Sequence, residues 1–378
     1  RIRAISWTCA IDRLGTGCGM GEERVLRMKK TLAALILLVI LARTSMVLAA
    51  EARSWPNGAI DWTPAKTNGQ GSRIALIDTG ISEQAIDPVH LDEGYNYLEQ
   101  SRDTDDRVGH GTALAGILLG LPAKNMPGIA PDAILVPLVY YSHDAGGKVL
   151  DGGSDLLAQA IRDAVKVYQC QISLIGAGTI GDSEVLQLAV EYAEKQGVVV
   201  VAAVGNENED HPEVEFFPAA YETVLGVAAL REDDGIATFS QRNQSVKLSA
   251  PGTDLRVATV RGRTVRAFGT SYAAAYVAGG VALLRAEYPS LAPDQVRSAL
   301  LATARDIGTQ GYDPDSGYGV LQINKARAMA REIDQTNHAT ATGRLRWMVI
   351  LATIILVAGV GSWILFARQK AQGKRQQP

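Results

Sequence analysis

Short, almost uninterrupted apolar runs recur through the middle of the chain, and they restrict its fold more than any other feature. Each run is only four to eight residues long and lacks the polar alternation of a half-exposed strand. Such runs are typical of strands that are covered on both faces, as in a parallel sheet. Five are predicted as strands: Arg73–Asp78, Ala133–Tyr140, Ile172–Ile175, Val198–Val204 and Val224–Ala229.

Amphipathic stretches lie between these runs. Asp155–Tyr168 and Ser183–Gln196 both place apolar residues along one helical stripe, and Gly197 ends the second stretch. A strand, a helix and a further strand in succession indicate a parallel sheet with helices on both faces. Because no long Pro- or Ser-rich linker divides residues 51–335, we expect one α/β domain there.

The N-terminal part of the sequence resembles a secretion signal. Four basic residues within 24–30 precede the apolar run Leu32–Leu41, and small residues follow at positions compatible with cleavage. Arg43 ends the run well short of the roughly 20 apolar residues that a spanning helix needs. We therefore expect residues 28–50 to be a cleaved signal peptide, and residues 1–27 to be upstream sequence or the result of a misassigned start.

A second apolar run, Trp347–Phe366, carries no charge and is long enough to cross a bilayer. It is apolar on all its faces, which favours a membrane helix over a buried core helix. More basic residues follow the run than precede it, so the positive-inside rule places the C-terminus in the cytoplasm. We expect a tether at 336–346, one transmembrane helix at 347–366 and a basic cytoplasmic tail at 367–378. The domain would then face the cell surface or the periplasm.

Charge gives little information about partners. The formal net charge is −3 and both signs are mixed along the chain, so we expect no nucleic-acid partner. Acidic residues gather in the stretch Glu207–Glu215 and at Asp103, Asp105 and Asp106. Three interpretations apply to them: a calcium site, a surface that selects basic substrates, or solvated surface loops. No Asx/Gly ligand spacing supports calcium, so solvated surface loops are favoured and no metal site is predicted.

Three loops carry the residue types of nucleophilic catalysis. Asp78 closes the first predicted strand, His110 lies between two glycines before the apolar helix 113–119, and Ser271 precedes the alanine-rich helix 272–288. In open α/β sheets, reacting groups gather beyond the carboxyl ends of the strands. Taken singly, each residue also fits a turn or a helix start.

The order Asp, His, Ser and the four segments IALIDTG, GHGTALAGI, VAAVGNEN and FGTSYAAAYVAG resemble the subtilisin family of serine peptidases, the subtilases. The resemblance implies a three-layer subtilisin-like fold with a mostly parallel sheet. It also implies a catalytic triad of Asp78, His110 and Ser271, with the Asn206 amide in the oxyanion hole. Such an enzyme cleaves protein or peptide substrates through an acyl-enzyme and requires no cofactor.

The chain departs from the family pattern where substrate is expected to bind. The segment Ile172–Gly178 (ISLIGAG) aligns with the family's substrate-binding segment, but its usual Asn and Ser positions are apolar. The alignment predicts Leu174, Ile175 and Gly176 as substrate-binding residues. It does not transfer a substrate preference.

The order of signal peptide, catalytic domain and C-terminal membrane helix is similar to the mycosin layout. Two alternatives to an endopeptidase stay open at this point. One is a catalytically silent subtilase-fold scaffold in a membrane complex, against which the filled catalytic positions argue. The other is an esterase or peptide ligase with the same acyl-enzyme, because these reactions differ only in acceptor and pocket.

Overall fold

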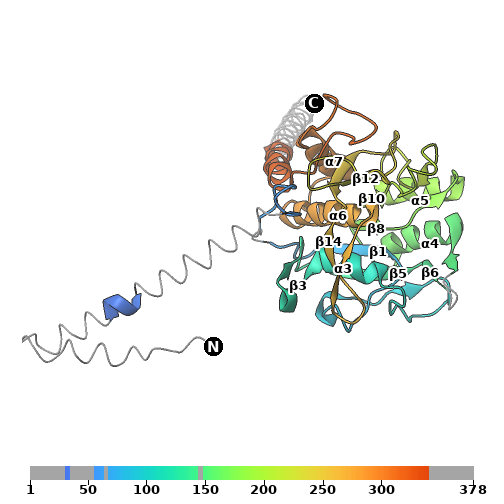
Figure 1. The fold of residues 1–378 in the computed structure, drawn as a ribbon, viewed down its shortest axis with the longest axis horizontal. Coiled ribbons are helices and arrows are strands. Elements are labelled where there is room, and N and C mark those ends of the chain that lie inside the picture. The colour runs from blue at the N-terminus through green and yellow to red at the C-terminus, as the bar shows by residue number, and fades with distance from the viewer. Residues whose placement is uncertain (1–29, 35–54, 64–66, 144–147, 340–378) are drawn as a thin grey trace, which may run out of the picture. The chain divides into compact units, whose positions relative to one another are not determined.

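The computed structural model of the chain describes residues 30–34, 55–63, 67–143 and 148–339 (Figure 1). Residues 30–34 are helical and belong to the unit Arg1–Ser54. The second unit, Trp55–Pro378, contains the sheet and the candidate site.

A seven-stranded parallel sheet forms the centre of this second unit, in the order β13-β12-β10-β8-β1-β5-β2 (Figure 1). Its strands are β1 (Arg73–Asp78), β2 (Tyr95–Asn96), β5 (Ile134–Val139), β8 (Ile172–Ile175), β10 (Val199–Ala203), β12 (Leu225–Leu230) and β13 (Leu248–Pro251).

Helices cover both faces of the sheet, as β1 illustrates. Ile74 and Leu76 join one buried apolar cluster, whereas Ala75 and Ile77 join another, and different helices contribute to each. Successive strand residues point to opposite faces, so the two clusters lie on the two sides of the sheet. The first face holds α3 (His110–Leu119), α6 (Thr270–Glu287) and α7 (Pro293–Ala302), and the second holds α4 (Gly153–Lys166) and α5 (Glu184–Lys195).

Short elements complete the described part of this unit. Four two-stranded ribbons pair β3 (Gly120–Leu121) with β4 (Met126–Pro127), β6 (Tyr141–His143) with β7 (Val149–Asp151), β9 (Thr179–Ile180) with β11 (Phe216–Phe217), and β14 (Leu255–Ala258) with β15 (Thr264–Ala267). The 3₁₀ turns are η1 (Pro88–His90) and η2 (Pro122–Lys124), and a helical stretch covers 323–339.

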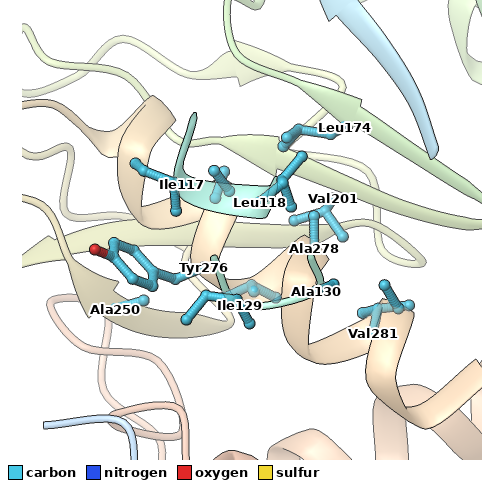
Figure 2. Close-up of a cluster of buried hydrophobic side chains, with 14 of the residues drawn as sticks. Ile117, Leu118, Ile129, Ala130, Leu174, Val201, Ala250, Tyr276, Ala278 and Val281 are labelled. Carbon is cyan, nitrogen blue, oxygen red and sulfur yellow. The ribbon is translucent and has the colours of Figure 1, made fainter. Parts of the chain in front are cut away.

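Small residues allow α6 to pack closely against the first face of the sheet. Figure 2 shows Ala278 of α6 and Leu118 of α3 beside Leu174 and Val201 of the sheet, all of them buried. A Cβ built on Gly279 would lie 2.6 Å from the Ile129 side chain, so glycine lets α6 lie close to the segment that precedes β5. The packing holds both α3 and α6 against the sheet, and both begin at its carboxyl edge.

The predicted α/β class, with a mostly parallel sheet and helices, is confirmed. The predicted strands agree with β1, β5, β8, β10 and β12 to within a residue at each end. Within the described ranges, no helix is long and apolar enough to cross a bilayer. The predicted membrane helix 347–366, the tail and most of the signal peptide lie outside these ranges. The helix 323–339 includes residues 336–339 of the predicted tether.

Candidate active site

The three residues singled out by the sequence lie together at the carboxyl edge of the sheet. Asp78 is the last residue of β1, His110 is the first residue of α3, and Ser271 is the second residue of α6. The N-cap of α6 is Gly269, so Ser271 does not cap the helix. Its side chain is therefore available for another partner.

A chain of hydrogen bonds connects these side chains. His110 Nδ1 lies 2.7 Å from Asp78 Oδ1, and His110 Nε2 lies 2.8 Å from Ser271 Oγ. An ionised carboxylate only accepts, so Nδ1–H donates to Asp78 and Nε2 accepts from the Ser271 hydroxyl. Asp78 is fully buried while the His110 side chain is 25% exposed, so the imidazole connects a buried carboxylate to a partly exposed site. This arrangement can draw a proton from Ser271.

The surroundings of His110 favour its charged form. Burial disfavours the imidazolium, but the Asp78 and Asp106 carboxylates favour it more, and the pKa of His110 is raised above its ordinary value. Tyr272 packs on the ring, with 5.6 Å between the ring centroids. Burial, and secondarily the Asp78 charge, raises the pKa of Tyr272 to about 12. The phenol therefore stays neutral while His110 titrates.

Asp106 holds the loop that carries His110. It is 2% exposed, and its two carboxylate oxygens accept five hydrogen bonds at 2.7–2.9 Å, from Thr79 Oγ1, Val108 N, Gly109 N, Thr112 N and Thr112 Oγ1. Thr79 directly follows Asp78, and the other donors lie on both sides of His110. The Asp106 carboxylate thus ties the end of β1 to the start of α3, the two elements that supply Asp78 and His110.

Asn206 lies beside the nucleophile. It follows Gly205 at the end of β10, and its Oδ1 accepts from Thr270 N at 2.9 Å and Thr270 Oγ1 at 3.0 Å. Thr270 directly precedes Ser271. Because these bonds occupy the amide oxygen, the amide nitrogen is left to donate to another group. Backbone N–H groups in the first turn of α6, including that of Ser271, also lack a helical partner. Together they can stabilise negative charge that develops next to Ser271 Oγ.

The predicted substrate-binding residues divide into two kinds. Leu174 and Ile175 are fully buried, with their side chains in the clusters on opposite faces of the sheet, so only their backbone could contact a substrate. Gly176 reaches the site: a Cβ built on it would lie 2.2 Å from Asp78 Oδ2 and 3.1 Å from His110 Cε1. Gly176 therefore encloses the carboxylate, and substrate contact by this segment stays a prediction.

The side-chain amide of Gln241 holds the acidic stretch Glu207–Glu215. Gln241 Nε2 donates to the carbonyl oxygens of His211 and Val214, at 2.9 and 2.6 Å. Across the described residues, no group of three or more His, Cys, Asp or Glu side chains is arranged to hold a metal ion. The carbonyl oxygens of His211 and Val214 therefore already accept from a protein donor.

Sequence reasoning missed Asp106 and Thr270 as parts of the site, since Asp106 was grouped with the surface carboxylates Asp103 and Asp105. A signal was present, because an Asp four residues before the helical His110 can accept from the free N–H groups of a helix start. No comparable local signal marks Thr270, whose role depends on Asn206, 64 residues away.

Comparisons with known proteins identify a family and several relatives. A model of the subtilase family matches residues 69–319. The minor extracellular protease Epr of Bacillus subtilis (strain 168) is 35% identical over 268 residues, which are 70% of this chain and 39% of Epr. A thermostable alkaline protease of Halalkalibacterium halodurans is 30% identical over 259 residues, 68% of each protein.

A similar solved structure is that of fervidolysin from Fervidobacterium pennivorans, described as a keratinolytic enzyme related to subtilisin. It superposes with a TM-score of 0.65 at 28% identity, over 72% of this chain and 45% of fervidolysin. The chain therefore spans less than half the length of Epr and of fervidolysin.

Proposed function

The chain belongs to the subtilase family, and we propose that it is a serine endopeptidase that hydrolyses peptide bonds through an acyl-enzyme on Ser271. One observation carries the proposal: the hydrogen bonds from Asp78 through His110 to Ser271, at 2.7 and 2.8 Å. A histidine so placed can act as the general base that makes a serine hydroxyl nucleophilic.

In the proposed reaction, Ser271 Oγ attacks the carbonyl carbon of the scissile bond while His110 Nε2 takes the hydroxyl proton. Asp78 holds the imidazole in the required tautomer and stabilises the imidazolium that forms. The carbonyl oxygen becomes negative and accepts from the Asn206 amide and the Ser271 N–H.

The second half of the reaction returns the proton. His110 gives it to the leaving nitrogen as the C–N bond breaks, which leaves the acyl group on Ser271 Oγ. His110 then deprotonates a water molecule that attacks the acyl carbon, and the acid product leaves as Ser271 recovers its proton. No step needs a cofactor.

A fluorophosphonate tests this proposal directly because it reacts only with an activated serine. We expect the full chain to gain one adduct, located on Ser271 by mass spectrometry of the intact protein and its fragments. Ser271→Ala and His110→Ala should gain none. An exposed serine in the described part, Ser290, serves as the matched control, because Ser290→Ala should label like the wild type. An unlabelled wild type would favour a silent scaffold, and a wild type that labels and hydrolyses esters but cleaves no peptide would favour an esterase.

Asp106 gives a prediction in pH dependence. Asp106→Asn removes a negative charge that raises the pKa of His110, and an amide cannot accept all the hydrogen bonds that the carboxylate accepts. Because His110 must be neutral to act as base, the acidic limb of the kcat/KM profile should move to lower pH. We expect kcat to fall on the order of 10²-fold, as for a slightly misplaced catalytic group. Asp105→Asn, at the exposed neighbouring position, should change neither. A limb that stays in place would assign Asp106 a purely structural role.

We further propose that the enzyme is anchored by one membrane helix at 347–366 with its catalytic domain outside the cytoplasm. The support is the uncharged run, the basic residues that follow it and the signal-like segment 28–50. Membrane fractionation of cells that express the full chain or a chain ending at 346 tests this. The shorter chain should leave the membrane fraction.

A further inference from the structure

The nucleophile limits where the acyl part of a substrate can lie. His110 must reach the leaving nitrogen, so the leaving side of the scissile bond lies toward His110. The residue that supplies the attacked carbonyl lies on the other side, toward Asn206. Its side chain must therefore meet the backbone segments that follow β8 and β10, adjacent strands that end next to the site.

Phe216 occupies the space between those two segments. A Cβ built on Gly205 would lie 2.2 and 2.4 Å from two carbons of the Phe216 ring, so the ring packs directly on the backbone that precedes Asn206. On the other side, a Cβ built on Gly178 would lie 3.5 Å from the Phe216 Cβ. Gly205 N also donates to Thr270 Oγ1 at 3.3 Å, so this backbone adjoins the residue before the nucleophile.

The ribbon of β9 and β11 holds Phe216 in place. Phe216 pairs with Ile180 in antiparallel register, and its carbonyl accepts from Ala220 N at 3.0 Å. The neighbouring Phe217 packs on Tyr221, with ring centroids 5.0 Å apart. Tyr221 Oη donates to Asp182 Oδ1 at 3.0 Å, which ties the two sides of the ribbon together. The ribbon therefore fixes the backbone of Phe216, and the Phe216 ring lies against Gly205.

We propose that Phe216 determines specificity by excluding large side chains from the residue whose carbonyl is attacked. The enzyme then cleaves after small residues such as alanine, serine and glycine, because the Phe216 ring fills the volume that a phenylalanine or lysine side chain would need. This inference rests on the proposed endopeptidase function and names the substrate class of the same site.

The test uses the full chain and two fluorogenic peptides that differ only in the residue before the scissile bond, alanine or phenylalanine. Active sites are first counted with a fluorophosphonate in every variant. The wild type should hydrolyse the alanine peptide with a kcat/KM at least about 10²-fold higher, the discrimination that a shaped pocket can supply. Phe216→Ala should raise kcat/KM for the phenylalanine peptide by at least about tenfold and change the alanine peptide less than threefold.

Two controls separate the possible failures. Ile180 is the cross-strand partner of Phe216, and the Ile180 residue is 64% exposed. Ile180→Ala should therefore keep the wild-type preference. Phe216→Leu provides a milder variant and should give an intermediate preference. A wild type that labels but cleaves both peptides equally, or a Phe216→Ala variant that labels but keeps the preference, would overturn the inference. A wild type that does not label would instead overturn the proposed function.

Discussion

Replacing Ser271 by alanine should lower kcat for a peptide substrate about 10⁶-fold, and replacing His110 by alanine should cost about as much, a magnitude that comes from subtilisin itself. The two side chains act as one unit, since His110 Nε2 accepts the Ser271 hydroxyl at 2.8 Å. The double variant should therefore be no slower than either single variant.

Asp78→Asn should lower kcat about 10⁴-fold, the loss known for this exchange in a serine-protease triad. Asp78 Oδ1 accepts from both His110 Nδ1 and Thr79 N, at 2.7 and 2.9 Å. An asparagine at position 78 carries no charge to stabilise the imidazolium. Where its amide nitrogen faces His110, it also fixes the tautomer whose Nε2 is protonated and unable to take the serine proton.

Single-turnover and steady-state rates, normalised to folded protein, would measure these losses. Ser290→Ala is the matched control and should retain wild-type rates. If the rate loss of the Ser271→Ala/His110→Ala double variant equalled the product of the two single losses, the two side chains would act independently, because independent contributions add in free energy. That result would contradict their action as one unit.

The sheet could be predicted from sequence where burial is continuous. Strands such as β1 and β10 are buried on both faces by apolar residues, so their runs stand out without any knowledge of their neighbours. β13 could not be found this way, since only Leu248 and Ala250 of the four residues Leu248–Pro251 are apolar. It becomes a strand because β12 pairs with it and Gly319 accepts from Ser249 N at 2.9 Å.

The residues of the candidate site also differ in whether the local sequence indicates them. Asp78, His110 and Ser271 each stand at a strand end or a helix start, where local sequence carries a signal. Phe216 does not: its backbone pairs with that of Ile180, 36 positions earlier in the chain, and no local pattern indicates this pairing. Leu174 and Ile175 illustrate the opposite case, in which an alignment indicates a segment but the twofold alternation of a strand turns both side chains into the cores.

Asn206→Leu should lower kcat by about 10²–10³-fold with little change in KM. Leucine has nearly the shape of asparagine but cannot donate to the oxyanion, and the magnitude comes from the corresponding loss of one donor in subtilisin. The donor matters only when the carbonyl oxygen carries negative charge, so the loss belongs to the transition state and not to substrate binding.

A substitution of Thr270 should have a smaller effect of the same kind. Asn206 Oδ1 accepts from both Thr270 N and Thr270 Oγ1, at 2.9 and 3.0 Å. Thr270→Val removes the hydroxyl and keeps the backbone bond, so the amide stays in place but is held less firmly. We expect a loss in kcat smaller than that of Asn206→Leu, and a double variant close to Asn206→Leu alone, because the hydroxyl acts through the amide.

Steady-state kinetics on the alanine peptide, with active sites counted by a fluorophosphonate, would measure both variants. An Asn206→Leu variant that raises KM and keeps kcat would show that the side chain binds the ground state of the substrate instead. The negative charge on the tetrahedral oxygen would then have to be met by the backbone N–H groups at the start of α6 alone.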